Sequence, residues 1–521
     1  MRKLPLGIQT FSEIRKEDMV YVDKTAYVWK LVSTNKYHFL SRPRRFGKSL
    51  MVSTLESYFR GERELFRGLE ISQHEKDWRV YPVVRIDLSK AKYLAEGELE
   101  NGLRQIVLDQ ARMHQLTLSG SDSTLLFGDL LRQLARRDKN VVVLVDEYDK
   151  PLVNVLDIPE VFESNRMLLN SFYGILKAHD EHLRFVFLTG ISRFSKVNVF
   201  SGLNNLLDIS LAAEYAGIVG FSQQEVETNF PDYLERLATQ FELSRSEMLE
   251  NLRVRYNGYS WDGETSYYNP ISLMNAFSTQ KLDTYWFKTA TPSFLYQSLV
   301  RDNIDPQELV NPGDFDLTGY ARADGSVPII PLLFQTGYLT IDRIERIDYD
   351  EFYHLRYPNQ EVEQSFLTLS AAAFKDVDIN DVGRSNFHIK RALLNGDLET
   401  VYRLTQAYLS DIPSRLRTER ESYYHSMVYF LYRMLGMRLL LEKEMDRGRI
   451  DAVLEMAERV YIFEFKYGKP NTVKPETLSR RALKQIKTNH YARPYLDRGK
   501  TITLVGLGFT EGTLHGRHEI L

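Results

Sequence analysis

Cysteine is absent from this chain of 521 residues, which excludes disulfide bonds and metal sites built from thiolates. No apolar run approaches the ~18 residues of a membrane-spanning helix, and residues 1–7 lack the apolar core of a signal peptide. A strong excess of one charge is also lacking. The formal net charge is −3 at pH 7, so any contact with DNA must use local basic patches. A cytoplasmic protein is therefore the expectation.

The length and apolar content of the chain predict several folded domains. A chain of 521 residues is too long for one hydrophobic core and is expected to hold about two to four domains. Hydrophobic residues make up 43% of it, an ordinary share for a globular protein, which argues against long disordered tails.

Residues 41–49 (SRPRRFGKS) form a phosphate-binding loop motif that has arginine in place of its first glycine. The usual pattern is G-x-x-x-x-G-K-[ST] between a strand and a helix. Gly47, Lys48 and Ser49 supply its second half, and the segments before and after it predict the strand and the helix. Backbone N–H groups at a helix N-terminus attract phosphate, the lysine adds charge, and the Ser49 hydroxyl would bind Mg²⁺. A chance G-K-S is the alternative.

Arg42 bears on how this loop works. The first glycine normally permits a tight turn around the phosphates, whereas arginine avoids such dihedral angles and Pro43 stiffens the loop. We expect Arg42, Arg44 and Arg45 to supply charge where backbone contacts are lost, so nucleotide binding is better supported than fast hydrolysis. The residues expected to contact ATP are Arg44, Arg45, Phe46, Gly47, Lys48, Ser49 and Asp146.

An acidic pair about 100 residues further on supports this interpretation. The run of residues 141–145 (VVVLV) predicts a strand buried on both faces, and it ends in Asp146 and Glu147. At this place a P-loop ATPase holds Mg²⁺ and polarises the attacking water, with Asp146 near the metal and Glu147 as the base. A core strand capped by solvated acids is the weaker alternative.

The order of the predicted elements indicates an α/β fold with a parallel sheet and helices on both of its faces, followed by three further parts. Residues 1–215 alternate strands and helices, 216–340 are mainly helical and form a lid, 341–400 form a connector, and 401–521 form an α+β domain. The expected strands of the first part are residues 37–40, 83–87, 141–145, 185–189 and 207–211. The expected elements of the last part are a helix at 422–441, strands at 451–456 and 461–466, a helix at 475–490 and a strand at 501–507.

The last part contains a second group of chemically active residues, Asp451, Glu464 and Lys466. We expect a hairpin with the loop 457–460, in which Met456 pairs with Tyr461 and Asp451 therefore pairs with Lys466. Glu464 shares their face by the two-residue period of a strand. Two carboxylates suit Mg²⁺ or Mn²⁺, and the lysine can position a water or a phosphate. A surface hairpin with a cross-strand ion pair is the alternative.

Residues on either side add to this group. Glu421 precedes the expected helix at 422–441 and would reach the metal, and Gln485 lies on the helix at 475–490. A basic helix beside a metal site suits the phosphate backbone of DNA. Its basic residues are Arg480, Arg481, Lys484 and Lys487. A solvated helix face and an ordinary N-terminal helix charge remain alternatives.

Together these motifs resemble a bacterial family of AAA-ATPase-like proteins with a C-terminal PD-(D/E)XK nuclease domain. In that family the loop often reads R-P-R-R-F-G-K, so the resemblance implies that Arg42 is a family trait, and it assigns Arg193 as a sensor of the γ-phosphate. The matching segments are residues 21–25, 42–49, 146–149, 189–196, 200–205, 256–259, 268–270, 421–426, 448–451, 464–466 and 485–486. The catalytic residues would be Glu147, Arg193, Asp451, Glu464, Lys466 and Gln485, and the metal ligands Ser49, Asp146, Glu421, Asp451 and Glu464.

We therefore expect a switch protein that binds ATP and Mg²⁺, hydrolyses ATP slowly, and controls a DNA-cleaving domain through its lid; assembly into a homo-oligomer stays open. One alternative is a signalling or scaffold ATPase whose nuclease-like domain binds nucleic acid without cutting it. Another is a binding protein that is inactive at both sites.

Overall fold

The computed structural model divides into two compact units. It describes residues 1–137, 140–192, 199–200, 203, 205–286, 314–315, 329–348, 350–375, 379–410, 428, 430–436, 438–445, 448–469, 472–510 and 513–521. The described residues before 287 and from 314 to 361 form the first unit, and those from 362 onward form the second unit. Within the described part of the chain, no helix is long and apolar enough to cross a bilayer.

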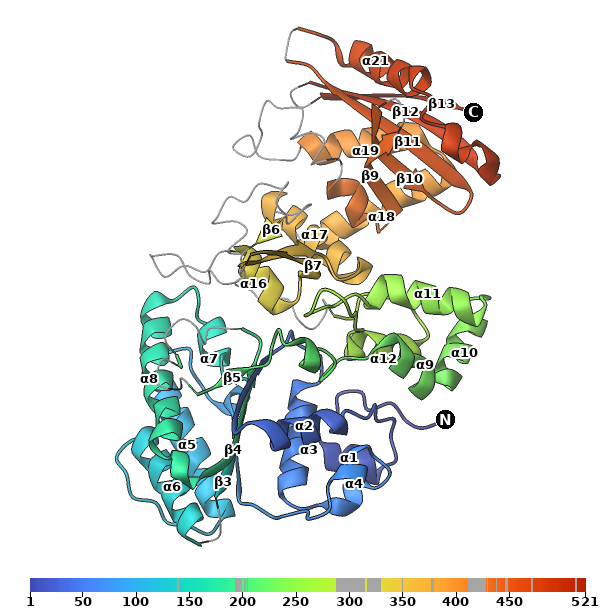
Figure 1. Cartoon of the computed structure of the whole chain (residues 1–521). Coiled ribbons are helices and arrows are strands. Elements are labelled where there is room, and N and C mark those ends of the chain that lie inside the picture. The colour runs from blue at the N-terminus through green and yellow to red at the C-terminus, as the bar shows by residue number, and fades with distance from the viewer. Residues whose placement is uncertain are drawn as a thin grey trace. The chain divides into compact units, whose positions relative to one another are not determined.

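The first unit is built on a five-stranded parallel sheet in the order β2-β3-β4-β1-β5, which confirms the predicted fold class. All six residues of β3 are buried, because helices cover both faces of the sheet (Figure 1). The strands are β1 (Tyr37–Ser41), β2 (Val83–Asp87), β3 (Val141–Asp146), β4 (Leu183–Gly190) and β5 (Leu207–Asp208). β5 is shorter than predicted.

Helices lie on both sides of this sheet (Figure 1). One group follows the amino terminus and the phosphate-loop motif: α1 (Phe11–Lys16), α2 (Thr25–Thr34), α3 (Lys48–Phe59) and α4 (Ile71–His74). The other group comprises α5 (Glu98–Met113), α6 (Ser123–Arg137) and α8 (Pro159–Ala178), with the short α7 (Lys150–Val153) after β3.

The strand order brings the predicted nucleotide residues to one edge of the sheet. Ser41 at the end of β1 pairs with Gly190 at the end of β4, and Asp146 at the end of β3 pairs with Asp87 of β2. The carboxyl ends of parallel strands share an edge, where ligands of open α/β sheets bind. The loop at 41–49 and the acidic pair Asp146–Glu147 therefore lie at the same edge.

The remainder of the first unit is mainly helical. Ser222 and Glu225 form a capping box at the start of α9. The helices are α9 (Gln223–Asn229), α10 (Pro231–Gln240), α11 (Arg245–Tyr256), α12 (Pro270–Thr279) and α16 (Ile329–Thr336). A three-stranded sheet ends the unit, with β6 (Asp314–Phe315), β7 (Thr340–Ile347) and β8 (Asp350–Arg356) in the order β6-β8-β7. The hairpin β7–β8 thus occupies part of the stretch that the sequence suggested as a connector.

The second unit contains a mixed five-stranded sheet in the order β13-β12-β11-β10-β9. Only β11 and β12 are parallel, and the helix α21 makes the crossover that a parallel pair needs. The strands are β9 (Arg438–Met445), β10 (Gly448–Glu455), β11 (Arg459–Tyr467), β12 (Thr501–Thr510) and β13 (Thr513–Ile520). The helices include α17 (Gln360–Lys375), α18 (Ile379–Asn395), α19 (Leu398–Ser410) and α21 (Pro475–Thr488).

Three details of this unit differ from the prediction. The expected helix at 422–441 was wrong at its end, because the apolar residues from Arg438 onward belong to strand β9. The expected loop of four residues at 457–460 is shorter, since Met456 donates its backbone N–H to Arg459 at 2.8 Å. Strand β13 was not predicted.

Two glycines allow α21 to approach the sheet closely. A Cβ atom added to Gly506 would lie 2.4 Å from the carbonyl oxygen of Ser479, and one added to Gly508 would lie 2.2 Å from that of Pro475. In the parallel register Gly506 pairs with Glu464 and Gly508 with Lys466. Because paired residues point to the same face, Glu464 and Lys466 lie on the face that α21 covers.

Candidate functional sites

The loop between β1 and α3 turns at different residues from those that the motif suggests. Arg45 and Gly47 have positive φ angles of 71° and 99°, and Gly47 caps α3. Glycine adopts such angles readily, whereas a non-glycine residue there marks a constrained loop. The loop therefore makes its left-handed turns at Arg45 and Gly47, and not at position 42, where the motif usually has glycine.

Arg42 does not supply charge to the loop, so that expectation was wrong. Its side chain is buried and donates hydrogen bonds to the carbonyl oxygens of Ser41 at 2.9 Å, Ser210 at 2.6 Å and Tyr215 at 3.2 Å. Its guanidinium carbon lies 4.1 Å from the centre of the Trp261 ring. These contacts turn the group toward the protein interior.

Lys48 is buried at the start of α3, and its ammonium group folds back over the loop. It donates to the carbonyl oxygens of Arg42 and Pro43, both at 2.9 Å. Burial lowers the pKa of Lys48 to about 8, and the charges of Asp146 and Asp149 partly offset this. An anion bound in the loop would offer the ammonium group a partner with full negative charge.

Asp146 is buried at the end of β3, close to Ser49 and Lys48. Burial raises the pKa of this carboxyl, while a hydrogen bond from Ser49 and the charge of Lys48 oppose the rise. A serine hydroxyl beside a carboxylate fits the oxygen ligands that Mg²⁺ prefers. The donor set formed by Ser49 and Asp146 therefore fits the expected cation.

Glu147 follows in a strained backbone conformation, with a φ angle of 52°. Its carboxylate lies 2.8 Å from the ammonium group of Lys150, three residues further on. A non-glycine residue in this region costs free energy and is often found at functional sites. The strain accords with a functional role for Glu147, and Lys150 restrains its side chain.

Asp149 is a buried residue whose structural role the sequence reasoning missed. Its carboxylate accepts the backbone N–H groups of Ile191 at 3.1 Å and Ser192 at 2.6 Å, directly after β4. A Cβ atom on Gly190 would lie 2.3 Å from this carboxylate. Asp149 thus ties the end of β3 to the end of β4. The acid-rich sequence at 146–149 was the available signal. Arg193 lies outside the described residues.

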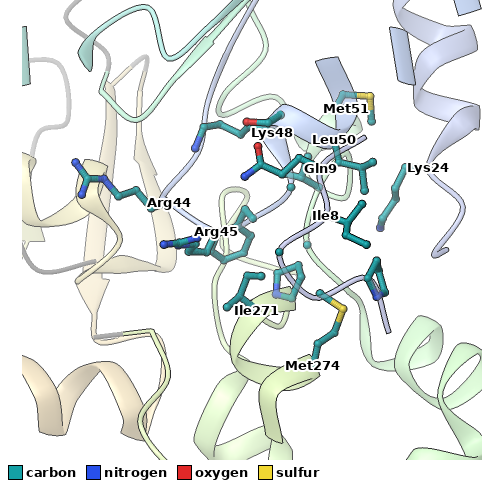
Figure 2. A pocket seen from close by; sticks show the side chains of 18 of the residues that line it. Ile8, Gln9, Lys24, Arg44, Arg45, Lys48, Leu50, Met51, Ile271 and Met274 are labelled. Atoms are coloured by element: carbon teal, nitrogen blue, oxygen red, sulfur yellow. The ribbon is translucent and has the colours of Figure 1, made fainter. Parts of the chain in front are cut away.

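A cavity of about 680 Å³ opens beside the loop (Figure 2). Figure 2 shows Arg44, Arg45 and Lys48 toward one side of the view and apolar side chains such as Ile8 and Met274 toward the other. Lys24 also lines the cavity, but its ammonium group is paired with Glu225 at 2.6 Å. The lining includes the loop residues Arg44, Arg45, Phe46, Gly47, Lys48 and Ser49, together with Glu147 and Asp149. The cavity therefore has a cationic part and an apolar part.

In the second unit, the hairpin brings Asp451 and Glu464 together in a register that differs from the expected one. Leu454 pairs with Tyr461, which places Asp451 opposite Glu464 instead of Lys466. The expected pairing of Met456 with Tyr461 was wrong by two residues because the turn is shorter. A shift of two preserves the face, so Asp451, Glu464 and Lys466 still share one side of the sheet.

Glu464 is almost fully buried, with 1% of its surface exposed. Its Oε1 atom accepts from the ammonium group of Lys466 at 3.0 Å, and its Oε2 atom has no hydrogen-bond partner among the described residues. Burial, and then the negative charge of Asp451, raise the pKa of Glu464 to about 7. A buried carboxylate oxygen without a partner is costly unless a cation or proton satisfies it. The pair of carboxylates therefore fits a divalent cation.

Asp451 is held in place by the backbone of the neighbouring strand. Its Oδ2 atom accepts the N–H of Phe465 at 2.7 Å. On the opposite face, Tyr461 donates to the carbonyl oxygen of Leu393 at 2.7 Å, and Phe463 and Phe465 are buried. The aromatic side chains anchor one face of β11, which leaves Glu464 and Lys466 on the other.

The basic helix α21 has a smaller free charge than the sequence suggested. Lys487 forms an ion pair with Glu519 of β13, whereas Arg480, Arg481 and Lys484 are exposed. Gln485 is half-buried on the same helix, and Glu421 lies outside the described residues. Among the residues that the structure describes, no group of three or more acidic or histidine side chains is arranged to hold a metal.

Comparison with known proteins matches part of each unit to a protein family. A family described as "Predicted AAA-ATPase" matches residues 5–200, and the PD-(D/E)XK nuclease superfamily matches residues 419–519. A protein of Azotobacter chroococcum mcd 1, described as an "Uncharacterized protein in vnfD 5'region", is 36% identical over 98% of this chain and 96% of its own length. The class is thus a P-loop ATPase-like domain joined to a nuclease-superfamily domain. The chain belongs to the family of proteins that carry this predicted AAA-ATPase domain with a C-terminal PD-(D/E)XK domain, which confirms the resemblance.

Solved structures show only low overall similarity. The Aeropyrum pernix ORC2 protein, solved as ADPNP-ADP complexes, is 12% identical with a TM-score of 0.29, over 67% of this chain and 92% of that one. The Aeropyrum pernix ORC1 protein in complex with DNA is 13% identical with a TM-score of 0.25, over 66% and 90%. Cdc6p from Pyrobaculum aerophilum is 10% identical with a TM-score of 0.26, over 66% and 91%.

Proposed function

We propose that this protein is an ATP-binding switch coupled to a metal-dependent nuclease domain that cleaves DNA. The observation that carries the proposal is the pairing of two sites in one chain. One is a cavity of about 680 Å³ that the phosphate loop lines, and the other is a buried carboxylate pair beside a lysine. The family matches of the two parts of the chain support the proposal.

At the nucleotide site, Lys48 and the backbone N–H groups at the start of α3 would bind the phosphates of ATP. Arg44 and Arg45 line the same cavity and add positive charge. Ser49 and Asp146 would hold Mg²⁺, which supplies charge neutralisation when bound. Glu147 would accept a proton from the attacking water, and its ion pair with Lys150 restrains its side chain, which supports slow turnover.

At the nuclease site, Asp451 and Glu464 would hold Mg²⁺ or Mn²⁺, a Lewis acid that activates water when bound. Lys466 would orient that water or stabilise the charge on the phosphate. Gln485 and Glu421 stay in the proposal as the residues that the sequence suggests beside this metal, whereas Arg193 belongs to the proposed nucleotide site as the sensor of the γ-phosphate. The exposed Arg480, Arg481 and Lys484 of α21 would contact the DNA backbone, with an affinity that falls as salt rises.

The decisive experiment is a cleavage assay on the purified full chain. Linear, circular and single-stranded DNA are incubated with Mg²⁺ or Mn²⁺, with and without ATP. We expect cleavage by the wild type and its loss in Asp451→Ala, Glu464→Ala and Lys466→Ala, of which only Lys466→Ala keeps most of its metal binding. Equal cleavage in the wild type and all three variants would show that the activity is a contaminant or lies elsewhere.

A second candidate function has one observation in its favour. Glu464 has a pKa near 7, and the described residues bring only two carboxylates together, which suits weak metal binding. Under this alternative the second unit binds nucleic acid without cutting it, and the chain acts as a signalling or scaffold ATPase. DNA binding without cleavage under every metal condition would favour it.

A further inference from the structure

The segment at residues 256–261 (YNGYSW) carries two aromatic side chains that pack against the phosphate loop. Tyr259 is 1% exposed and Trp261 is 5% exposed. We call Tyr259 and Trp261 the aromatic clamp. Neither residue lines the cavity, so direct contact with a nucleotide does not explain their position.

The aromatic clamp holds the loop at Phe46, the residue before Gly47. The ring of Phe46 meets Tyr259 edge-on at 4.7 Å between centres and Trp261 edge-on at 5.3 Å. Edge-to-face pairs at such distances stabilise a contact beyond the burial of their surface. The carbonyl oxygen of Phe46 also accepts the backbone N–H of Gly220 at 3.2 Å. Phe46 is therefore fixed by both its side chain and its backbone.

The aromatic clamp also holds the loop at Arg42, where a phosphate loop usually has glycine. The Arg42 guanidinium stacks on Trp261 at 4.1 Å, and its hydrogen bonds to Ser41, Ser210 and Tyr215 fix its plane. The loop backbone thus gains a rigid anchor on each side of its central residues. Between the anchors lie Arg44 and Arg45, which line the cavity.

From this geometry we infer that Tyr259 and Trp261 are positioning residues for nucleotide binding. They hold the loop in its binding conformation through Arg42 and Phe46, and so replace the restraint that a tightly turning glycine loop would supply. The inference rests on the proposed binding of ATP at this loop.

The same segment is connected to the hairpin that ends the first unit. Ser260 donates its N–H to the Thr340 hydroxyl at 2.7 Å, and that hydroxyl donates to the Ser260 carbonyl oxygen at 2.9 Å. The carbonyl oxygen of Gly258 accepts from Arg356 at 3.1 Å. Ordering of the loop by a nucleotide is therefore expected to reach the start of β7 through the Thr340 hydroxyl and the end of β8 through the Arg356 guanidinium.

The test compares ATP affinity with stability in matched variants. Calorimetric titration with ATP and Mg²⁺, well below the unfolding temperature, should show that Trp261→Leu weakens binding about tenfold. Trp261→Phe should keep most of the wild-type affinity for ATP, because phenylalanine also offers an aromatic face to Arg42. Phe127→Leu is the control: this buried aromatic packs on Phe172 at 4.7 Å, does not line the cavity, and should lower stability without changing affinity.

If Trp261→Leu fails to fold, two further measurements still test the inference. Arg42→Lys keeps the charge but loses the flat stacking surface and the forked donors, and it should also weaken ATP binding. In the wild type, ATP should slow amide hydrogen exchange in residues 256–268.

The outcomes separate the inference from the proposed function. One outcome is that the wild type binds ATP and that folded Trp261→Leu and Arg42→Lys bind it with the same affinity. That result would overturn the inferred role of the aromatic clamp and leave the proposed nucleotide site in place. Absence of ATP binding by the wild type would overturn the proposed nucleotide site and the aromatic clamp with it. Equal loss of affinity in Phe127→Leu would show that the effect is general destabilisation.

Discussion

At both candidate sites, individual charged side chains are buried in the protein. Lys48 and Asp146 are buried together, so each lowers the cost of burying the other. Glu464 is buried beside another carboxylate and has one ammonium partner. Such perturbed groups are often functional, and they also predict how the protein responds to mutation and to pH.

Lys48→Ala should weaken ATP binding about 10- to 100-fold, because it removes a charge-assisted contact with phosphate. Burial lowers the pKa of Lys48 to about 8, so the affinity of the wild type should also fall above that pH. Calorimetry measures both effects, with the exposed Lys92→Ala as control. Unchanged affinity in a folded Lys48→Ala protein would remove the basis for the P-loop assignment.

Glu464→Gln should stabilise the second unit at pH 8 without divalent metal, by about 1–3 kcal/mol. The pKa of Glu464 is raised from 4.5 to about 7, so between these values the folded state binds more protons than the unfolded state. Stability is therefore lost as the pH rises from 4.5 to 7 and stays lower above it. The amide introduced by Glu464→Gln is neutral at every pH, so it does not lose stability in this way.

Thermal unfolding with a chelator, at pH 5 and pH 8, tests this expectation. The difference between Glu464→Gln and the wild type should grow toward pH 8. Glu476→Gln, which changes an exposed carboxylate on α21, is the matched control. A difference of the same size at both pH values would contradict the assignment of a raised pKa.

Among the elements, the contact between α21 and β12 positions the helix beside the candidate nuclease site. Gly506 and Gly508 bring the helix backbone against the strand, beside Glu464 and Lys466. This packing therefore fixes the backbone of α21, from which the basic side chains extend, relative to the carboxylates. A small change at these glycines should move the helix as a whole.

Gly508→Ala should destabilise the second unit by about 1–3 kcal/mol, because the new methyl group meets backbone atoms that cannot move alone. Gly383→Ala on α18 is the control: its Cβ would have no atom within 4 Å, and alanine favours a helix, so it should be neutral or stabilising. Calorimetric unfolding of both variants measures the difference. A stable Gly508→Ala protein with full cleavage activity would show that α21 does not need this close approach.

At the scale of the whole molecule, the proposed function joins an ATP-binding domain and a nuclease domain in one chain, which predicts that the nucleotide state regulates cleavage. Glu147→Gln should keep ATP binding and slow hydrolysis, because it removes the proposed base and leaves Asp146, the proposed metal ligand, in place. If ATP controls the nuclease domain, ATP should raise the cleavage rate about fivefold or more in the wild type and in Glu147→Gln, but not in Lys48→Ala. Parallel ATPase and DNA-cleavage assays test this. Cleavage that is equal with and without ATP in all three proteins would show that the domains act independently.

Local patterns in the sequence determined the α/β class, most strands of the parallel sheet, and the faces of the carboxylates. This was possible because a buried strand needs a continuous apolar run and because the side chains of a strand alternate with period two. The shift of two residues in the β10–β11 register preserved the shared face of Asp451 and Glu464 for the same reason.

Only the tertiary structure decided what Arg42, Asp149 and Trp261 do. Their partners are distant in the sequence: Arg42 bonds to Ser210 and Tyr215 and stacks on Trp261, and Asp149 binds the backbone after β4. A motif specifies residue types along the chain, whereas a buried charge is directed by whichever carbonyl groups and rings surround it after folding. That is why an arginine expected at the phosphates became part of the loop's internal support.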